Sequence, residues 1–214
     1  MEESYPFIIT ISRQIGSGGS YIGRELSKRL NMFYADREII REAAKELSVH
    51  EEDIESIDEK VSGWDLFLKS FVAAPDLCLP SKFNVTTDAE LFKTESEIIE
   101  RLAKDRSSVI VGRSSSFVLR NHPNHISLFL HGDLDFRIQK IKETNKIDDE
   151  EARKIISQTD KARALYFKTF TKQEWCDARL YDLSINTTKL GYDKSVELIL
   201  NYIEIRNSIK GKNE

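Results

Sequence analysis

Three glycines close together are the first residues in this sequence that could do chemistry. They lie in ISRQIGSGGSYIG, between an apolar run and a helical pattern. A turn rich in glycine can adopt positive φ and expose its backbone N–H groups, and the helix that follows adds the positive end of its dipole. Such a turn suits a phosphate group. We therefore expect these residues to contact one: Gly16, Ser17, Gly18, Gly19, Ser20 and Tyr21.

The turn lacks the lysine that phosphate-binding loops usually carry. Against the pattern G-x-x-x-x-G-K-[ST], Arg13 takes the place of the first glycine and Gly19 that of the lysine. Ser20 takes the place of the hydroxyl residue that binds magnesium. Arg13 could fold its long side chain over the phosphates and supply the missing charge as a planar fork. Alternatively, Arg13 pairs with a carboxylate such as Asp36 and contributes only structure, or the turn binds no ligand.

Five short apolar runs, separated by helical patterns, would position this turn. The runs are continuous rather than alternating, which is typical of parallel strands buried on both faces. They cover residues 7–11, 33–35, 109–112, 126–131 and 183–186. Helical spacing of apolar residues occurs between and after them, over residues 20–30, 37–47, 91–103, 134–144, 150–170 and 194–206. Strands that alternate with helices predict an α/β sandwich with right-handed crossovers.

Length, charge and cysteine content limit the classes of function. The 214 residues fit one domain, and the net charge of −4 argues against nucleic-acid or membrane-surface binding, because such binders present a clustered basic face. Two cysteines and four scattered histidines give neither a disulfide framework nor metal-ligand spacing. No apolar run approaches transmembrane length, and no basic segment with a long apolar stretch opens the chain, so we expect a cytoplasmic protein.

Two stretches interrupt the alternation of strands and helices. Residues at about 48–90 include an acidic run and two prolines with little strand signal, and we interpret them as a helical insertion with a loop. Residues at about 146–175 form a long, charged helical stretch before the last strand. Some apolar residues of the insertion could cover either the core or a second subunit, which leaves a homo-oligomer open: Trp64, Leu66, Phe67 and Phe71.

The motifs as a set resemble the cytidylate-kinase-like family, a branch of the P-loop nucleoside monophosphate kinases. The resemblance rests on ITISRQIGSGGSYIGRELSKRL, FYADREIIREAAKE, VIVGRSSSFVLR, TDKARALYFKTFT and YDLSINTTKLG, in that order. It implies a three-layer α/β/α P-loop NTPase fold: a five-stranded parallel sheet in the order 2-3-1-4-5, flanking helices and a helical lid. Residues 1–214 would form a single domain. The insertion at about 48–90 would bind the monophosphate, and the stretch at about 146–175 would contain the lid.

The resemblance also implies which residues bind the acceptor. Arg113, at the end of the third strand, corresponds to an arginine that contacts the monophosphate, and a guanidinium fork suits a phosphate. Arg41 corresponds to the family's other such arginine, and Asp36 matches a polar residue at the start of the same helix. The alternatives are a surface arginine at a strand end and an ordinary exposed helix face.

In the lid stretch, three charged residues resemble those of cytidylate kinases. Asp160, Lys161 and Arg163 correspond to a segment in which arginines neutralise the transferring phosphate and an aspartate contacts the cytosine side. A solvated helix face is the alternative. Arg163 is also the second candidate to replace the loop lysine. Many P-loop kinases hold magnesium with an aspartate at the end of the third strand, but Val111 precedes the glycine here, so Ser20 is the metal ligand that the sequence offers.

These observations predict a kinase that uses ATP and Mg²⁺. It would phosphorylate a nucleoside monophosphate such as CMP or dCMP, or another small acceptor, with Arg13, Arg113 and Arg163 neutralising the transferred group. Phosphoryl transfer between nucleotides requires positioning and charge neutralisation more than a base. The alternative is a nucleotide or phosphate sensor that has lost catalysis and acts through a partner. The absent lysine and aspartate favour that alternative. We expect small-molecule nucleotides as partners, and neither nucleic acid nor membrane.

Overall fold

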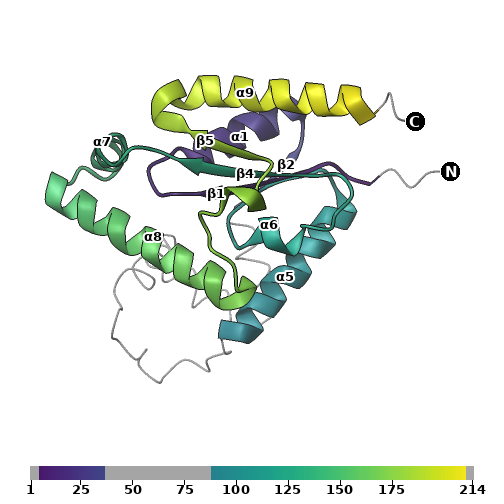
Figure 1. Ribbon diagram of the computed structural model, residues 1–214, viewed down its shortest axis with the longest axis horizontal. Helices are drawn as coiled ribbons and strands as arrows, with labels where there is room; N and C mark the ends of the chain where they lie inside the picture. Colours follow the sequence, from purple (N-terminus) through teal and green to yellow (C-terminus); the bar gives the residue numbers. More distant parts are fainter. Residues whose placement is uncertain (1–4, 37–87, 211–214) are drawn as a thin grey trace, which may run out of the picture.

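A five-stranded parallel sheet forms the centre of the computed structural model, which describes residues 5–36 and 88–210 (Figure 1). The strand order is β2-β3-β1-β4-β5, and every neighbouring pair is parallel. The strands are β1 (Ile8–Arg13), β2 (Phe33–Ala35), β3 (Ser108–Val111), β4 (His125–His131) and β5 (Leu183–Asn186). The predicted α/β fold and its strand order are confirmed.

Helices cover both faces of this sheet. Figure 1 shows α1 and α9 on one face, and α5, α6 and α8 on the other. The described helices are α1 (Gly19–Leu30), α5 (Asp88–Asp105), α6 (Ser115–Val118), α7 (Leu134–Asn145), α8 (Asp149–Thr171), the 3₁₀ helix η1 (Ala178–Leu180) and α9 (Thr187–Lys210). This arrangement places the carboxyl ends of the parallel strands, and the loops that follow them, at one edge of the sheet.

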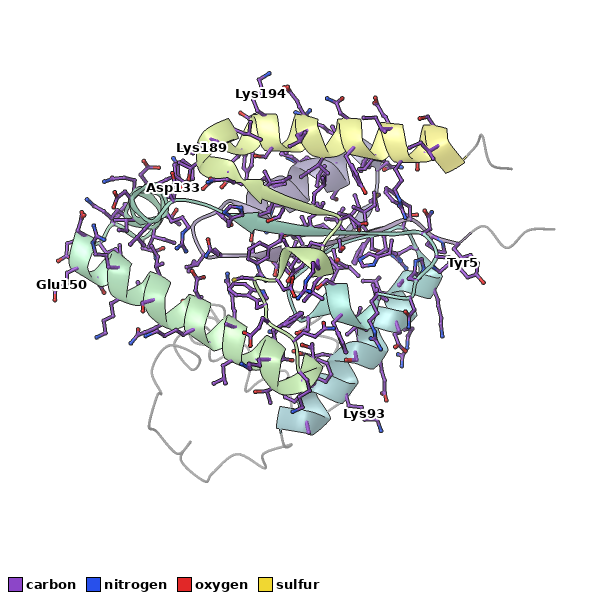
Figure 2. The ribbon with its side chains drawn as sticks, in the orientation of Figure 1. Tyr5, Lys93, Asp133, Glu150, Lys189 and Lys194 are labelled. Atoms are coloured by element: carbon purple, nitrogen blue, oxygen red, sulfur yellow. The ribbon has the colours of Figure 1, made fainter. Side chains whose placement is uncertain are left out.

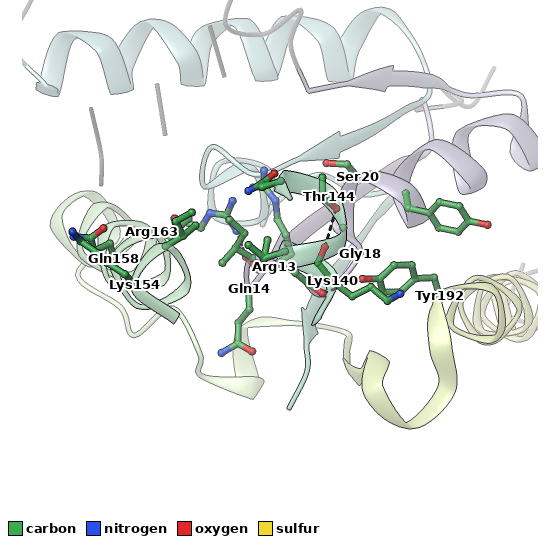
Figure 3. A pocket seen from close by; sticks show the side chains of 18 of the residues that line it. Arg13, Gln14, Gly18, Ser20, Lys140, Thr144, Lys154, Gln158, Arg163 and Tyr192 are labelled. Carbon is green, nitrogen blue, oxygen red and sulfur yellow. Dashed lines mark hydrogen bonds between the residues drawn. The ribbon is translucent and has the colours of Figure 1, made fainter. Parts of the chain in front are cut away.

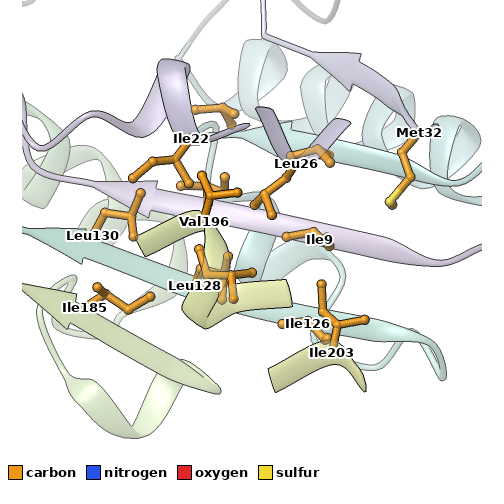
Figure 4. Close-up of a cluster of buried hydrophobic side chains, with 14 residues drawn as sticks. Ile9, Ile22, Leu26, Met32, Ile126, Leu128, Leu130, Ile185, Val196 and Ile203 are labelled. Carbon is orange, nitrogen blue, oxygen red and sulfur yellow. The ribbon is translucent and has the colours of Figure 1, made fainter. Parts of the chain in front are cut away.

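The core explains why the strands are continuous apolar runs. All six residues of β1 are buried. Ile9 and Ile11 pack with residues of α1 and α9 on one face, as Figure 4 shows for Ile9, and Ile8 packs with α5 on the other. Since helices cover both faces, neither set of alternating side chains meets water.

Several boundaries differ from the prediction. Strand β1 continues to Arg13, two residues past the predicted end at 11, because Ser12 and Arg13 still pair with β4 although they are polar. Helix α9 begins at Thr187 rather than 194 and is broken at Gly191, whose φ is 73°. The predicted helix over 37–47 and the insertion at about 48–90 lie outside the described residues, except for the last residues of the insertion, which begin α5 at Asp88. Arg41 and the apolar group Trp64, Leu66, Phe67 and Phe71 are among the residues outside the description.

The outer surfaces of the helices carry mostly polar side chains. Figure 2 shows, for example, Glu150 at the start of α8 and Lys194 on α9, both exposed. In the two described ranges, no helix combines the length and the apolar character needed to cross a membrane.

Candidate functional site

The glycine turn joins β1 to α1 at the carboxyl edge of the sheet. Gly16 has a φ of 78° and Gly18 a φ of 83°, in the left-handed region that favours glycine. Ser17 is fully buried, and its hydroxyl donates to the backbone oxygens of Gln14, at 2.7 Å, and Leu130, at 3.2 Å. The Ser17 side chain therefore supports the shape of the turn, and the contact of Ser17 with a phosphate stays a prediction.

Helix α8 stabilises the beginning of the turn through Asp160. Asp160 accepts a hydrogen bond from the Ile15 backbone N–H at 2.9 Å, and its other oxygen accepts one from Arg137 Nη1 at 2.5 Å. Arg137 is 7% exposed and also donates to the backbone oxygens of Ile15 and Gly132. Asp160, predicted to face the acceptor, is thus engaged with the turn, while Lys161 beside it is exposed. The roles of both in substrate binding stay predictions.

Helix α9 holds the other side of the turn through Tyr192. The break at Gly191 places this ring against Gly18, so closely that a Cβ at position 18 would lie 2.5 Å from Tyr192 Cε1. The Tyr192 hydroxyl donates to the Gly16 backbone oxygen at 3.0 Å, and burial raises the pKa of Tyr192 to about 12, so the hydroxyl keeps its proton at neutral pH. Tyr21, at the start of α1, donates to Asp193 at 2.6 Å.

Arg13 is buried beside the turn. Its side chain crosses the start of α1 and reaches the end of β3: its Cγ lies where a side chain at position 19 would begin, and its Nη1 lies where one at position 112 would begin. Burial lowers the pKa of Arg13, and the Asp36 carboxylate opposes this effect. The guanidinium is therefore held in place before any ligand arrives.

Arg163 of α8 lies beside Arg13, as Figure 3 shows. Its Nη1 donates to the Arg13 backbone oxygen at 2.8 Å. Burial, followed by repulsion from Arg13, lowers the pKa of Arg163 to about 9, with Asp160 and Asp36 acting in the opposite direction and Arg113 adding to the repulsion. The three arginines named from the sequence are thus within electrostatic reach of one another, and an anion bound among them would offset their repulsion.

Arg113 follows β3 in an unusual backbone turn. Gly112, Arg113 and Ser114 have φ values of 88°, 58° and 52°, so three successive residues are left-handed. The side chain of Arg113 is 8% exposed and pairs with Glu95 of α5 at 2.9 Å, while Tyr166 of α8 donates to the second Glu95 oxygen at 2.7 Å. Arg113 is therefore a buried residue held between two helices, unlike the surface arginine of the alternative interpretation.

Ser20 and Asp36 bring a hydroxyl oxygen and a carboxylate oxygen together. Asp36 follows β2, is 9% exposed, and accepts hydrogen bonds from the Tyr34 hydroxyl at 2.9 Å and from Ser20 Oγ at 3.4 Å. Hydroxyl and carboxylate oxygens suit a magnesium ion that also keeps waters and substrate phosphate oxygens. Over residues 5–36 and 88–210, no cluster of three or more His, Cys, Asp or Glu side chains could hold a metal.

A pocket of about 660 Å³ opens above the turn (Figure 3). Its walls come from the turn, the start of α1, the end of α7, one side of α8 and Tyr192 of α9. One wall residue, Thr159, is 1% exposed, and its Oγ1 has no hydrogen-bond partner among the residues that the structure describes. A buried hydroxyl without a partner is uncommon and suits a ligand or an ordered water. The volume is in the range of small-molecule sites.

Sequence reasoning missed Arg137, Tyr192 and Thr159. Arg137 and Thr159 lie in stretches of mixed charge that look solvated, and Tyr192 lies just before the predicted helix over 194–206. The glycine in KLGYDK could have indicated that the helix is broken at Gly191, with the Tyr192 ring next to the break.

Comparison with known proteins identifies the relatives of the chain. The model of the cytidylate kinase-like family matches residues 8–189. The cytidylate kinase of Methanopyrus kandleri is 24% identical over 206 residues, which cover 92% of each chain. That of Sulfolobus acidocaldarius is 26% identical over 200 residues, which cover 93% of this chain and 95% of the relative.

Solved structures share the fold. A crystal structure of an uncharacterized protein from Eubacterium ventriosum superimposes with a TM-score of 0.67 at 24% identity and covers 92% of this chain and 98% of its own. A shikimate kinase from Acinetobacter baumannii, in complex with shikimate, has a TM-score of 0.51 at 14% identity and covers 95% and 96%. At these identities the likeness concerns the fold alone.

Proposed function

Because the chain belongs to the cytidylate kinase-like family, we propose that it transfers a phosphoryl group from ATP to a nucleoside monophosphate, with CMP and dCMP as the first candidates. The observation that carries the proposal is the convergence of Arg13, Arg113 and Arg163 beside the glycine turn. Arg13 and Arg113 both repel Arg163, and a transferring phosphoryl group is an anion that would offset this repulsion.

The donor would bind with its phosphates on the turn and its nucleoside in the pocket above. Backbone N–H groups of the turn and the N-terminus of α1 would contact the phosphates. The pocket of about 660 Å³ offers an aromatic side chain, Tyr192, and the unpartnered hydroxyl of Thr159. Both are features that an ATP nucleoside can use, by ring contact and by hydrogen bond.

A magnesium ion would lie between Ser20 and Asp36. When bound, the ion supplies positive charge to the phosphate oxygens of the donor. Asp36 was predicted as an acceptor residue; its carboxylate next to Ser20 also suits the metal, in place of the third-strand aspartate that this chain lacks.

The acceptor would bind on the side of Arg113. This arginine pairs with Glu95 and would contact the monophosphate, together with Arg41 and Lys161 as the resemblance implies. Arg163, carried by α8, and Arg13 would neutralise the group in transfer. No general base is required, since the acceptor is already a phosphate oxygen.

The test is ADP formation from ATP and Mg²⁺ with a panel of nucleoside monophosphates. Arg163→Ala should lower turnover by about a hundredfold or more, the usual effect of removing one charge-stabilising group. The matched control is Arg153→Ala on the same helix, whose side chain is 51% exposed and contacts Asp135; it should keep full turnover. Equal loss in both variants would contradict a special role for Arg163.

The second candidate function is a nucleotide sensor without catalysis. Glycine at position 19 and the absence of a third-strand aspartate favour it. ATP binding with no turnover on any monophosphate would support the sensor and exclude the kinase for those acceptors.

A further inference from the structure

We infer that arginine at position 13 and glycine at position 19 depend on each other. The Arg13 side chain occupies the space that a side chain at position 19 would need, and it supplies from β1 the positive charge that a lysine at position 19 would supply. This inference rests on the proposed function for the part that concerns ATP. It also explains why both departures from the loop pattern occur in the same chain.

The backbone conformation of the turn shows why position 19 is glycine for a steric reason. Gly16 and Gly18 have positive φ, which favours glycine, but Gly19 is not among the residues with positive φ, so its conformation would accept a side chain. The Arg13 side chain beside it, however, leaves no room for one. A Cβ at position 19 would lie 2.6 Å from Arg13 Cγ, 3.1 Å from its Cβ and 3.3 Å from its Cδ. Carbon atoms that are not bonded do not approach to 2.6 Å.

Arg13 cannot move aside as a whole. Its backbone lies in β1 and pairs with Leu130 of β4, which fixes its Cβ. Its backbone oxygen accepts the hydrogen bond from Arg163. The far end of the side chain is confined as well, because a Cβ at position 112 would overlap Nη1 of Arg13. The Arg13 side chain thus occupies the space beside Gly19 and Gly112 that a side chain at either position would need.

The positive charge of Arg13 lies at the far end of its side chain. The guanidinium lies at the end of β3, next to the turn and to Arg113, with Arg163 close by. Asp36 acts on both Arg13 and Arg163, and it accepts hydrogen bonds from Tyr34 and Ser20. A phosphate group supplies the acceptors that one shared carboxylate does not.

The steric part is tested by unfolding alone. Gly19→Ala should lower the unfolding midpoint of the unmodified chain, and the loss should vanish in an Arg13→Gly background. The matched control is Gly23→Ala on the same helix: its Cβ would meet Val111 and Tyr34 but not Arg13, so its cost should be the same in both backgrounds. An equal cost of Gly19→Ala in both backgrounds overturns the inference. If Arg13→Gly does not fold, Arg13→Ala takes its place, since it removes the Cγ contact too.

The charge part is tested by ATP binding in calorimetry and by turnover. Arg13→Gly and Gly19→Lys should each weaken ATP binding at least tenfold. The double variant Arg13→Gly/Gly19→Lys, which completes the pattern as GQIGSGKS, should recover most of it. A double variant no better than Arg13→Gly overturns the exchange of charge. If the unmodified chain neither binds ATP nor turns over, the proposed function fails, and the unfolding measurements still decide the steric part.

Discussion

At the scale of single residues, four arginines of this site lie in three different environments. Arg13 is buried and the half-buried Arg163 lies beside it, Arg113 pairs with Glu95, and Arg137 pairs with Asp160. Arg13 repels Arg163, and a bound anion would offset this repulsion, whereas Arg137 pairs with Asp160 and donates to two backbone oxygens. Environment therefore separates the arginines that can serve chemistry from the one that holds the structure.

Asp36→Asn should raise the Mg²⁺ concentration needed for half-maximal turnover by about tenfold or more, because a neutral amide is a weaker ligand for this cation than a carboxylate. A titration of turnover against Mg²⁺ at saturating ATP measures this. Asp135→Asn serves as the control, since its side chain is 91% exposed and lies on α7. If only the KM for the monophosphate changes, Asp36 contacts the acceptor and not the metal.

At the scale of elements, two helices from distant parts of the chain fix the turn. Asp160 of α8 binds Ile15 across 145 positions of sequence, and Tyr192 of α9 binds Gly16 across 176. The shape of the turn therefore depends on contacts with α8 and α9 as well as on its own residues, and the helices that line the pocket also hold the turn.

Asp160→Ala should lower the free energy of unfolding by about 3 kcal/mol, the cost of leaving a buried arginine without its partner. The exposed pair between Arg153 and Asp135 supplies the control: Asp135→Ala should cost less than about 1 kcal/mol. Urea unfolding measures both. In the pair of substitutions Asp160→Ala/Arg137→Met, the cost should be smaller than the sum of the single costs; additive costs would mean that the two residues act independently.

Tyr192→Phe should increase amide hydrogen exchange in residues 16–18 while leaving exchange in β1 and β4 unchanged. The substitution keeps the ring against Gly18 and removes only the hydrogen bond to the Gly16 oxygen, worth about 1 kcal/mol. Tyr202→Phe, on the same helix, is the control and should leave the turn as it is. If the exchange rates of residues 16–18 are the same in Tyr192→Phe and Tyr202→Phe, the Tyr192 hydroxyl does not stabilise the turn.

Elements with a local signal could be predicted from the sequence, and contacts between distant elements could not. Continuous apolar runs and helical spacing indicated the five strands and the order of elements, and the glycines indicated the turn. The end of β1 was placed too early, because Arg13 and Ser12 are polar although they pair within the sheet. Arg137 and Tyr192 were missed, since their partners Asp160 and Gly16 are known only once the fold brings them together.

At the scale of the whole molecule, one buried histidine ties global stability to pH. His125, at the start of β4, is 8% exposed, and its Nε2 lies 2.7 Å from the Thr10 hydroxyl of β1. Burial lowers the pKa of His125 to about 4, against the opposing effect of Asp182. The folded pKa is below the unfolded value of about 6.5, so the folded state prefers the neutral ring.

The contribution of His125 to stability should thus be complete above about pH 6.5 and be lost as the pH falls toward 4, with a total of about 3 kcal/mol at most. His125→Gln should show a flatter decrease of unfolding free energy over this range than the unmodified chain. His131→Gln, at the partly exposed end of the same strand, is the control. Parallel pH profiles for His125→Gln and the unmodified chain would contradict the assignment.

The contact of Arg13 with Gly19 also restricts how such a loop can arise by mutation. An ancestor with lysine at position 19 could not gain a large side chain at position 13 without a clash, and one with glycine at both positions would lack the cation. Substitutions at the two positions should therefore be epistatic, and they should covary among relatives: small at 13 with lysine at 19, or arginine at 13 with glycine at 19. A family alignment can check this pairing, and motif searches that demand the lysine would overlook chains of the second kind.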